Sequence, residues 1–135
     1  MLTKILAENL IQKAKHLIAH ADKLVLLTHT SPDGDAVGSC LAMADYLTNL
    51  GKTVQVIFPD PLPPFLAWLP GAEEALVYAT NQESCQSFIN QAEAILMLDF
   101  NHPGRMGAVA ELVSMRSVPK ILFDHHPDPA SFADV

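Results

Sequence analysis

Acidic and imidazole side chains recur at three places in the chain, each directly after a run of apolar residues. The residues concerned are His29, Asp33 and Asp35, then Asp99, then Asp124, His125 and His126. Four carboxylates brought together would repel one another unless a positive group lay among them. A divalent metal ion meets that need. Mixed histidine and carboxylate ligands suit manganese, iron, cobalt or zinc, whereas sites for magnesium and calcium use mainly oxygen ligands.

The spacing of these residues indicates a centre with two ions. Asp33 and Asp35 are two residues apart on one turn, so each can reach a different ion, and Asp99 can lie between the ions and bridge them. Paired ions of this kind are roughly 3.5–4 Å apart. Successive side chains of an extended segment point to opposite sides, so we expect one of His125 and His126 to bind metal and the other to face substrate. The predicted cofactor is a pair of Mn²⁺ ions, with Mg²⁺ or Co²⁺ as alternatives.

Each cluster also has an ordinary structural explanation. The sequence SPDG is typical of a turn, Asp35 by itself fits a helix N-cap, and Asp99 could cap the helix after it. The Asp-His-His sequence is harder to explain, because three hydrophilic groups at a strand end have no packing role. His16 and His20, by contrast, lack the intervening glutamate of a metalloprotease helix, so we expect them on a solvated helix face.

The elements expected between the clusters place all three clusters at one edge of a sheet. Apolar periodicity predicts helices over residues 3–21, 37–51, 83–91 and 103–115, and strands over 23–28, 52–58, 94–98 and 120–123. Strands alternating with helices through short connections predict an α/β fold with a mainly parallel, doubly wound sheet and helices on both faces. Ligands of such sheets bind beyond the carboxyl ends of the strands, where the clusters lie.

Composition narrows the class of protein further. The chain has 135 residues, 50% of them hydrophobic, which excludes disorder and suits one compact domain. A formal net charge of −7 speaks against a polybasic nucleic-acid groove. Cys40 and Cys85 form no CxxC pair and are expected to be buried, and no secretory or membrane-spanning segment is evident, so we expect a cytoplasmic protein. In the Pro-rich segment 59–71, Phe65 and Trp68 are expected to be packing anchors rather than base-stacking platforms.

Three motifs resemble those of the DHH phosphoesterases. HTSPDGDAVGS, from His29, resembles the first motif of that family, HxxxDxDxxGS, while LDFNHPGRMG, from Leu98, resembles the second and FDHHP, from Phe123, the third. They occur in the family's order, each at a predicted strand end. FLAWLPGAEE, from Phe65, resembles the FLPG segment of the branch of small oligoribonucleases, the nanoRNases, that also act on 3′-phosphoadenosine 5′-phosphate.

The resemblance implies a metal-ligand set. His29, Asp33 and Asp99 would hold one Mn²⁺ ion, and Asp35, Asp99 and His125 would hold the second. Asp99 would touch both ions and is therefore assigned a catalytic role as well.

The resemblance also implies roles in catalysis and substrate binding. His126 would contact the scissile phosphate or assist the leaving group, and Asp124 would orient the neighbouring histidines. Arg105 would help to hold phosphate. Ser39, beside Gly38, would lie at a helix start where backbone amides approach an anion.

The predicted function is that of a Mn²⁺-dependent phosphoesterase acting by two-metal in-line attack on phosphorus. Its expected substrates are short RNA or DNA oligonucleotides, cleaved to mononucleotides, or the 3′-phosphate of 3′-phosphoadenosine 5′-phosphate. The acidic composition of the chain favours such small substrates over long nucleic acids. A homodimer is compatible with the sequence. Alternatives are an inorganic pyrophosphatase-like phosphohydrolase, a non-catalytic nucleotide- or metal-binding module, and a receiver-like signalling domain. DHH proteins carry a fourth motif and a second, substrate-binding domain, so we expect residues 1–135 to form an incomplete N-terminal lobe.

Overall fold

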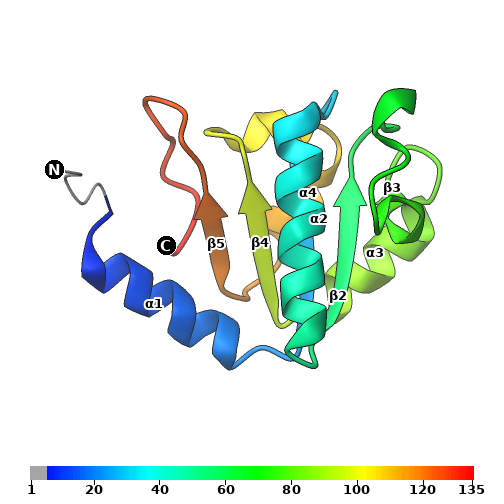
Figure 1. Cartoon of the computed structure of the whole chain (residues 1–135). Helices are drawn as coiled ribbons and strands as arrows, with labels where there is room; N and C mark the ends of the chain where they lie inside the picture. Colours follow the sequence, from blue (N-terminus) through cyan, green and yellow to red (C-terminus); the bar gives the residue numbers. More distant parts are fainter. Residues whose placement is uncertain (1–5) are drawn as a thin grey trace, which may run out of the picture.

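Helices and strands alternate along residues 6–135, the part of the chain that the computed structural model describes. The helices are α1 (Glu8–Ala19), α2 (Gly34–Asn49), α3 (Gln82–Gln91) and α4 (Val109–Ser114). The strands are β1 (Lys23–Leu27), β2 (Thr53–Phe58), β3 (Leu76–Val77), β4 (Ala94–Leu98) and β5 (Lys120–Phe123). Short 3₁₀ turns are η1 (Pro64–Leu66), η2 (Ala72–Glu74) and η3 (Pro103–Met106) (Figure 1). The start of the helix predicted over 3–21 lies outside the described residues, and α1 begins at Glu8.

The strands form one parallel sheet in the order β3-β2-β1-β4-β5. From β1 the chain adds β2 and β3 on one side, then crosses to add β4 and β5 on the other. The direction of winding therefore reverses between β1 and β4, where Leu24 pairs with Ala94. The predicted parallel, doubly wound α/β fold is confirmed. Open α/β sheets bind ligands at such a switch point, beyond the carboxyl ends of the two strands.

Side chains of the sheet alternate between two apolar layers. Leu24 and Leu26 of β1 pack into the layer that contains α1 and α2, whereas Val25 and Leu27 pack into the layer of α3 and α4. Helices on both faces explain why the strands are continuous apolar runs. Burial of each such side chain stabilises the fold by about 1.5–3 kcal/mol. The strands are therefore packed firmly between the two helical layers, and so are the ends that carry the polar clusters.

Two local elements differ from the prediction. The single helix predicted over residues 103–115 is divided into η3 and α4, because Gly107 between them has a φ of +59°. A Cβ atom on Gly107 would also lie 2.8 Å from Cγ2 of Thr30, so this turn is fitted closely against the loop after β1. Strand β3 was not predicted, since two residues are too short to produce a recognisable alternation.

The expectation that Phe65 and Trp68 anchor the Pro-rich loop is wrong. The two residues are 71% and 75% exposed, whereas Leu66 between them is buried at 8%. The η1 turn directs Leu66 towards the apolar layer of α2 and leaves the two aromatic side chains in solvent. Leu66 and Ala72 provide the anchoring contacts instead.

Other side-chain predictions are confirmed. Cys40 and Cys85 are free thiols and are buried, and His16 and His20 lie exposed on or beside α1. Within residues 6–135, the structure contains no helix with the length and hydropathy needed to cross a membrane.

Candidate metal centre

The polar clusters lie together because β1, β4 and β5 are neighbours in the sheet and end at the same edge. The Thr28 hydroxyl donates a hydrogen bond of 2.7 Å to the carbonyl of Leu98, which joins the ends of β1 and β4. The Asp99 N–H donates to the carbonyl of Phe123 at 2.9 Å, which joins β4 to β5. These bonds fix the separation of the three segments that carry the clusters.

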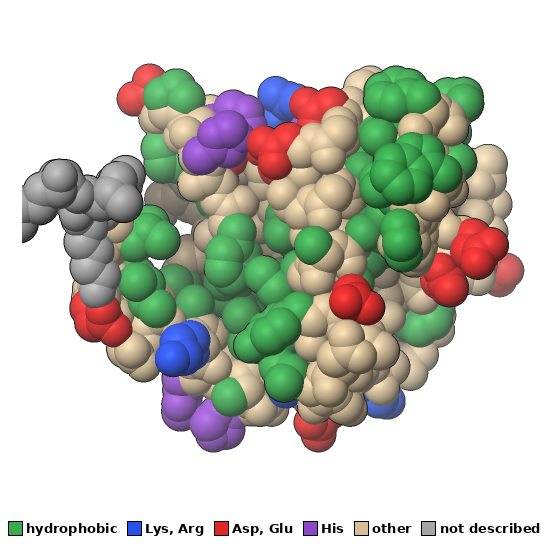
Figure 2. Space-filling model, in the orientation of Figure 1, with side chains coloured by type: hydrophobic (Ala, Val, Ile, Leu, Met, Phe, Trp, Pro, Cys, Tyr) green, Lys and Arg blue, Asp and Glu red, His purple; other side chains and the backbone are tan. Residues whose placement is uncertain are grey.

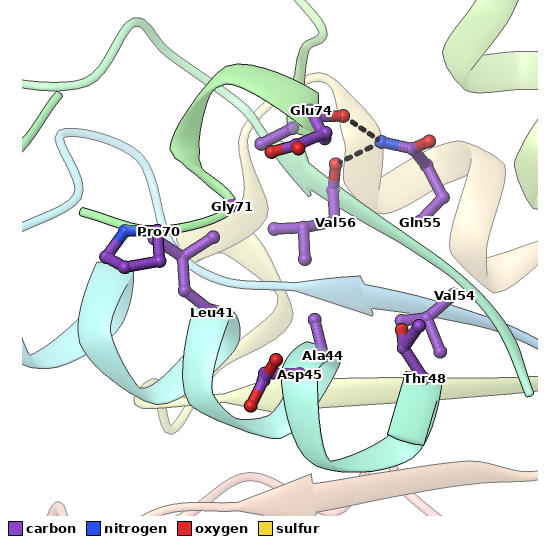
Figure 3. A pocket seen from close by; sticks show the side chains of 11 residues that line it. Leu41, Ala44, Asp45, Thr48, Val54, Gln55, Val56, Pro70, Gly71 and Glu74 are labelled. Carbon is purple, nitrogen blue, oxygen red and sulfur yellow. Dashed lines mark hydrogen bonds between the residues drawn. The ribbon is translucent and has the colours of Figure 1, made fainter. Parts of the chain in front are cut away.

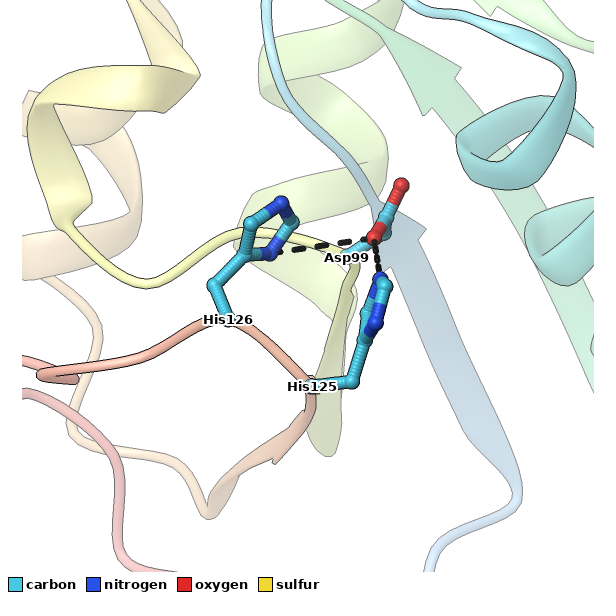
Figure 4. A group of neighbouring side chains, drawn as sticks. All are labelled: Asp99, His125 and His126. Carbon is cyan, nitrogen blue, oxygen red and sulfur yellow. Dashed lines mark hydrogen bonds and ion pairs between the residues drawn. The ribbon is translucent and has the colours of Figure 1, made fainter.

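Asp99 is at the centre of the site. Its side chain is only 6% exposed, and Oδ1 lies 3.0 Å from Nε2 of His125 and 3.8 Å from Nδ1 of His126 (Figure 4). Oδ2 lies 3.7 Å from Nε2 of His29. Its φ of +68° places the backbone in the left-handed region, which costs free energy for most residues but is tolerated by aspartate and asparagine. Strained backbone of this kind clusters at functional sites. The buried carboxylate thus has an imidazole near each oxygen.

His29 is oriented by the backbone. Its side chain is 5% exposed, and Nδ1–H donates to the carbonyl of Thr30 at 2.7 Å. The other ring nitrogen, Nε2, then faces the carboxylates of Asp33 and Asp99, at 3.8 and 3.7 Å. A histidine held through one nitrogen in this way presents the lone pair of the other to a metal ion.

Asp33 and Asp35 flank the start of α2. Asp33, rather than Asp35, is the N-cap of α2, because its Oδ1 accepts the Ala36 N–H at 3.0 Å. This hydrogen bond is the main reason why the pKa of Asp33 is lowered, and the nearby imidazole of His29 lowers it further. Oδ2 of Asp35 lies 3.2 Å from Nε2 of His125. Both carboxylates therefore combine a helix-terminus position with contact to a site histidine.

His125 and His126 do not point to opposite sides as predicted. Their ring centroids are 4.8 Å apart and both rings approach Asp99, because the two residues follow the end of β5 and are not part of the strand (Figure 4). The two nitrogens nearest Asp99 are not equivalent. Nδ1–H of His126 already donates to Asp124 at 2.6 Å, and this hydrogen bond raises the pKa of His126, whereas Nε2 of His125 faces only Asp35 and Asp99.

The donor set fits divalent metal. Within residues 6–135, two groups of three residues have potential ligand atoms all within 4.8 Å of one another: one is His29, Asp33 and Asp99, and the other is Asp99, His125 and His126. Asp99 belongs to both groups, as a bridging ligand would. The first group is the set predicted for one ion. In the second predicted set, His125 contacts both Asp35 and Asp99, while His126 is close to Asp99 but is engaged by Asp124.

Of the three residues predicted to bind substrate, His126 lies within this cluster, and Ser39 and Arg105 lie on elements that adjoin it. The prediction that Ser39 lies at a helix start is wrong, because α2 begins at Gly34 and Ser39 lies more than one turn into it. Its hydroxyl donates to Asp35 at 3.3 Å. Arg105 is exposed on η3, and its charge opposes the rise in the pKa of His126. The Arg105 carbonyl accepts the N–H of Thr30 at 2.7 Å, so η3 is joined to the loop that carries His29.

One residue near the site was missed by the sequence analysis. The carboxylate of Asp60, which follows β2, accepts the Ser31 N–H at 2.7 Å. This bond joins the loop after β2 to the loop after β1. The sequence did contain a signal for it: Asp60 follows the last residue of β2 by two positions, at the same predicted edge of the sheet as the three clusters.

A groove elsewhere on the surface contributes nothing to this cluster. It has a volume of about 410 Å³ and lies between α2, β2 and the segment around Gly71, with Leu41 and Val56 among its apolar lining and Asp45 and Glu74 at its margin (Figure 3). It contains none of the residues predicted to bind metal or substrate.

Comparison with known families agrees with the geometry of the cluster. Residues 23–135 match the sequence family described as the DHH family, N-terminal domain. The chain belongs to the DHH family. The resemblance seen in the three motifs is therefore confirmed for the family, while membership in the nanoRNase branch stays a prediction.

A solved structure with the same fold is the crystal structure of an exopolyphosphatase-related protein from Bacteroides fragilis. The DHH chain described here is 38% identical to it, with a TM-score of 0.95 over 99% of the present chain. The match covers 39% of the Bacteroides protein, so the present chain spans less than half of that protein's length.

Proposed function

We propose that this DHH chain is the metal-binding lobe of a phosphohydrolase that depends on divalent metal. The observation that carries the proposal is the position of Asp99, a buried carboxylate with His29 near one oxygen and His125 near the other. Asp33 and Asp35 add one carboxylate on each side. Membership in the DHH family supports a phosphoester or phosphoanhydride as the bond that is cleaved.

The proposed ligand set is the one predicted from the sequence. His29, Asp33 and Asp99 would hold one cation, and Asp35, Asp99 and His125 the other. When bound, paired divalent ions activate water and neutralise charge on phosphate. We propose Mn²⁺ because the donors are a mixture of imidazole and carboxylate, with Mg²⁺ or Co²⁺ as substitutes.

His126 is proposed to act on substrate rather than on metal. Asp124, whose side chain is 5% exposed, holds Nδ1–H of His126 and also accepts its backbone N–H at 3.2 Å. Binding of a cation at Nδ1 would break the first of these bonds. The free nitrogen, Nε2, is thus the atom available to donate a hydrogen bond to a phosphate oxygen or a proton to the leaving oxygen.

The proposed substrates are short oligonucleotides, released as mononucleotides, or the 3′-phosphate of 3′-phosphoadenosine 5′-phosphate. Long nucleic acids are bound through many Lys and Arg contacts to phosphate, and this chain has 8 basic against 15 acidic residues. Hydrolysis of an inorganic phosphoanhydride is a second candidate, favoured by the similarity to the exopolyphosphatase-related protein.

Metal binding and substrate choice can be tested separately. Dialysis of the chain against Mn²⁺, followed by elemental analysis, should give two ions per chain, and Asp99→Asn should lose them. Asp45→Asn, which removes an exposed carboxylate on α2 in the groove away from the site, is the matched control and should retain both ions. An absence of bound metal in the wild-type chain would contradict the proposed centre.

The activity assay compares three substrates in the presence of Mn²⁺: a short RNA, 3′-phosphoadenosine 5′-phosphate and inorganic pyrophosphate. We expect release of mononucleotide from the RNA or of phosphate from the adenine nucleotide. Preferential cleavage of pyrophosphate would favour the second candidate. Bound metal without turnover of any substrate would favour a non-catalytic metal-binding module.

A further inference from the structure

Two large aromatic side chains are presented to solvent on one short, ordered turn. Phe65 and Trp68 are exposed, while Leu66 is packed into the core. The turn is held by backbone hydrogen bonds: the N–H of Leu66 donates to Pro63 at 2.9 Å, and the N–H of Leu69 donates to Leu66 at 3.2 Å. Exposed apolar residues are common one at a time, but two rings fixed on one turn indicate a surface that binds something.

This turn is part of the segment that is joined to the metal-site loop. The segment leaves β2 at the same edge of the sheet as the site, and Asp60 within it accepts the Ser31 N–H at 2.7 Å. Ser31 has a φ of +50° and lies midway between His29 and Asp33, so the bond holds the segment to the stretch that carries two of the proposed ligands. Figure 1 shows the segment, in green, at the upper right between the ends of β2 and β3, at the same end of the sheet as the start of α2. In Figure 2, hydrophobic side chains lie along the same upper edge as the histidine and acidic side chains.

The charge of the segment limits what the two rings could bind. Residues 59–75 contain Asp60, Glu73 and Glu74 but no Lys or Arg, in a chain whose net charge is −7. A substrate with phosphates cannot gain affinity here from basic side chains. Aromatic rings, by contrast, stack on nucleobases without any need for positive charge, and every base offers a face for stacking.

We propose that Phe65 and Trp68 form a stacking platform for a nucleobase of a substrate whose phosphate lies at the Asp99 cluster. The inference rests on the proposed phosphohydrolase function and deepens it, because it makes the substrate a nucleotide rather than an inorganic phosphoanhydride. The Asp60–Ser31 bond would keep the platform at a fixed position relative to the site. A nucleobase is favoured over a protein partner since the platform is joined to the loop where phosphate is expected to bind.

Trp68 is the only tryptophan of the chain, so its fluorescence reports on the platform directly. The probes are adenosine 5′-monophosphate and ribose 5-phosphate, titrated in the presence of Mg²⁺ with excitation where adenine does not absorb. Saturable quenching by the nucleotide but not by the sugar phosphate is the expected result. Phe65→Leu should weaken the nucleotide titration by about tenfold, the loss typical of one stacking contact. Phe88→Leu, on the partly exposed Phe88 of α3, is the matched control and should leave it unchanged.

An activity measurement gives a second, independent result. For Trp68→Ala we expect the KM for a dinucleotide to rise about tenfold with little change in kcat, while hydrolysis of a phosphodiester that carries no base is unaffected. Trp68 is exposed, so loss of folding is not expected, and circular dichroism checks this.

The outcomes separate this inference from the proposed function. If the wild-type chain hydrolyses no substrate, the proposed function fails, yet the fluorescence titration still decides whether the rings bind a base. Equal effects of the two probes on Trp68 would overturn the platform. A second pair of results would also overturn it: the wild-type fluorescence does not respond to nucleotide, and Trp68→Ala has a lower molecular mass than the wild type in sedimentation analysis. The rings would then be a contact between copies of the chain.

Discussion

The most decisive prediction concerns the charge of Asp99. Asp99→Asn keeps the size of the side chain, and asparagine tolerates the left-handed φ of +68° as aspartate does. The amide oxygen can still accept the hydrogen bond of 3.0 Å from His125. The substitution therefore removes one negative charge from the space between His29 and His125 while leaving the fold intact.

The size of the effect follows from the double role of Asp99. Loss of a residue that only supports a metal ligand lowers metal affinity by about 10- to 100-fold, and a ligand in contact with both ions should reach at least the upper end of that range. Metal at 100 times its dissociation constant stabilises a folded protein by about 2.7 kcal/mol; after a 100-fold loss of affinity, the same concentration contributes about 0.4 kcal/mol. For a domain of this size, these values correspond to a rise in Tm of about 10 °C for the wild type and about 1–2 °C for the variant.

The assay is thermal unfolding with and without Mn²⁺, followed by circular dichroism. Without metal, the variant should be at least as stable as the wild type, because one carboxylate is removed from a cluster that also contains Asp33 and Asp35. Addition of a chelator should reverse the metal-dependent rise in the wild type. Asp45→Asn should show the full rise. An equal rise in Tm for Asp99→Asn and the wild type would refute the assignment of Asp99 as a shared ligand.

Three further predictions concern the surroundings of the site. Gly107→Ala should lower the free energy of unfolding by about 1–3 kcal/mol, since φ is positive and the new Cβ would lie 2.8 Å from Thr30. Gly38→Ala is the control and should not lower it, because a Cβ there meets no atom within 4 Å. Equal midpoints of the two variants in urea unfolding would contradict this prediction. His126→Ala should slow hydrolysis but leave the metal content near that of the wild type, and loss of bound metal would show that His126 is a ligand. Asp124→Asn should lower the pKa of His126 towards its ordinary value of 6.5, because the hydrogen bond that Nδ1–H of His126 donates to Asp124 is the main cause of the rise. NMR titration of the ring measures the change, and an unaltered pKa would exclude that cause.

The sign of the pH effect on stability follows from the direction of the same shift. The pKa of His126 is raised in the folded state, so the folded state binds this proton more tightly than the unfolded state does. The stability gained is fully present at pH values below the unfolded pKa of about 6.5 and is lost as the pH rises through the folded pKa. In Asp124→Asn, the dependence of Tm on pH in this window should become weaker.

Much of the fold was predictable because it depends on local patterns. The apolar runs of β1 and β4 and the helical spacing within α2 are properties of short stretches, and parallel strands joined by helices leave few topologies. The parts that were not predictable depend on contacts between distant segments. Gly107 divides the predicted 103–115 helix where it packs against Thr30, and the orientation of Phe65 and Trp68 is decided by which side chain of η1 enters the core.

The candidate site shows the same division. Residue types and their position after strands indicated which side chains would gather, and the structure brings His29, Asp33, Asp35, Asp99 and His125 into one cluster. The directions of the two adjacent histidines were predicted incorrectly, because the alternation rule applies only within a strand and these residues follow its end.

By itself, the sequence determined the family, the parallel α/β sheet and the identity of the side chains that carry chemistry, because each is encoded in residue types at short spacing. Only the tertiary structure decided that Asp99 lies between His29 and His125, that His126 is engaged by Asp124, and that Asp60 joins the aromatic turn to the loop of the metal site. The physical reason is that hydrogen bonds and ion pairs between side chains depend on positions to within about 0.5 Å, and such positions are fixed only when the strands pack into one sheet.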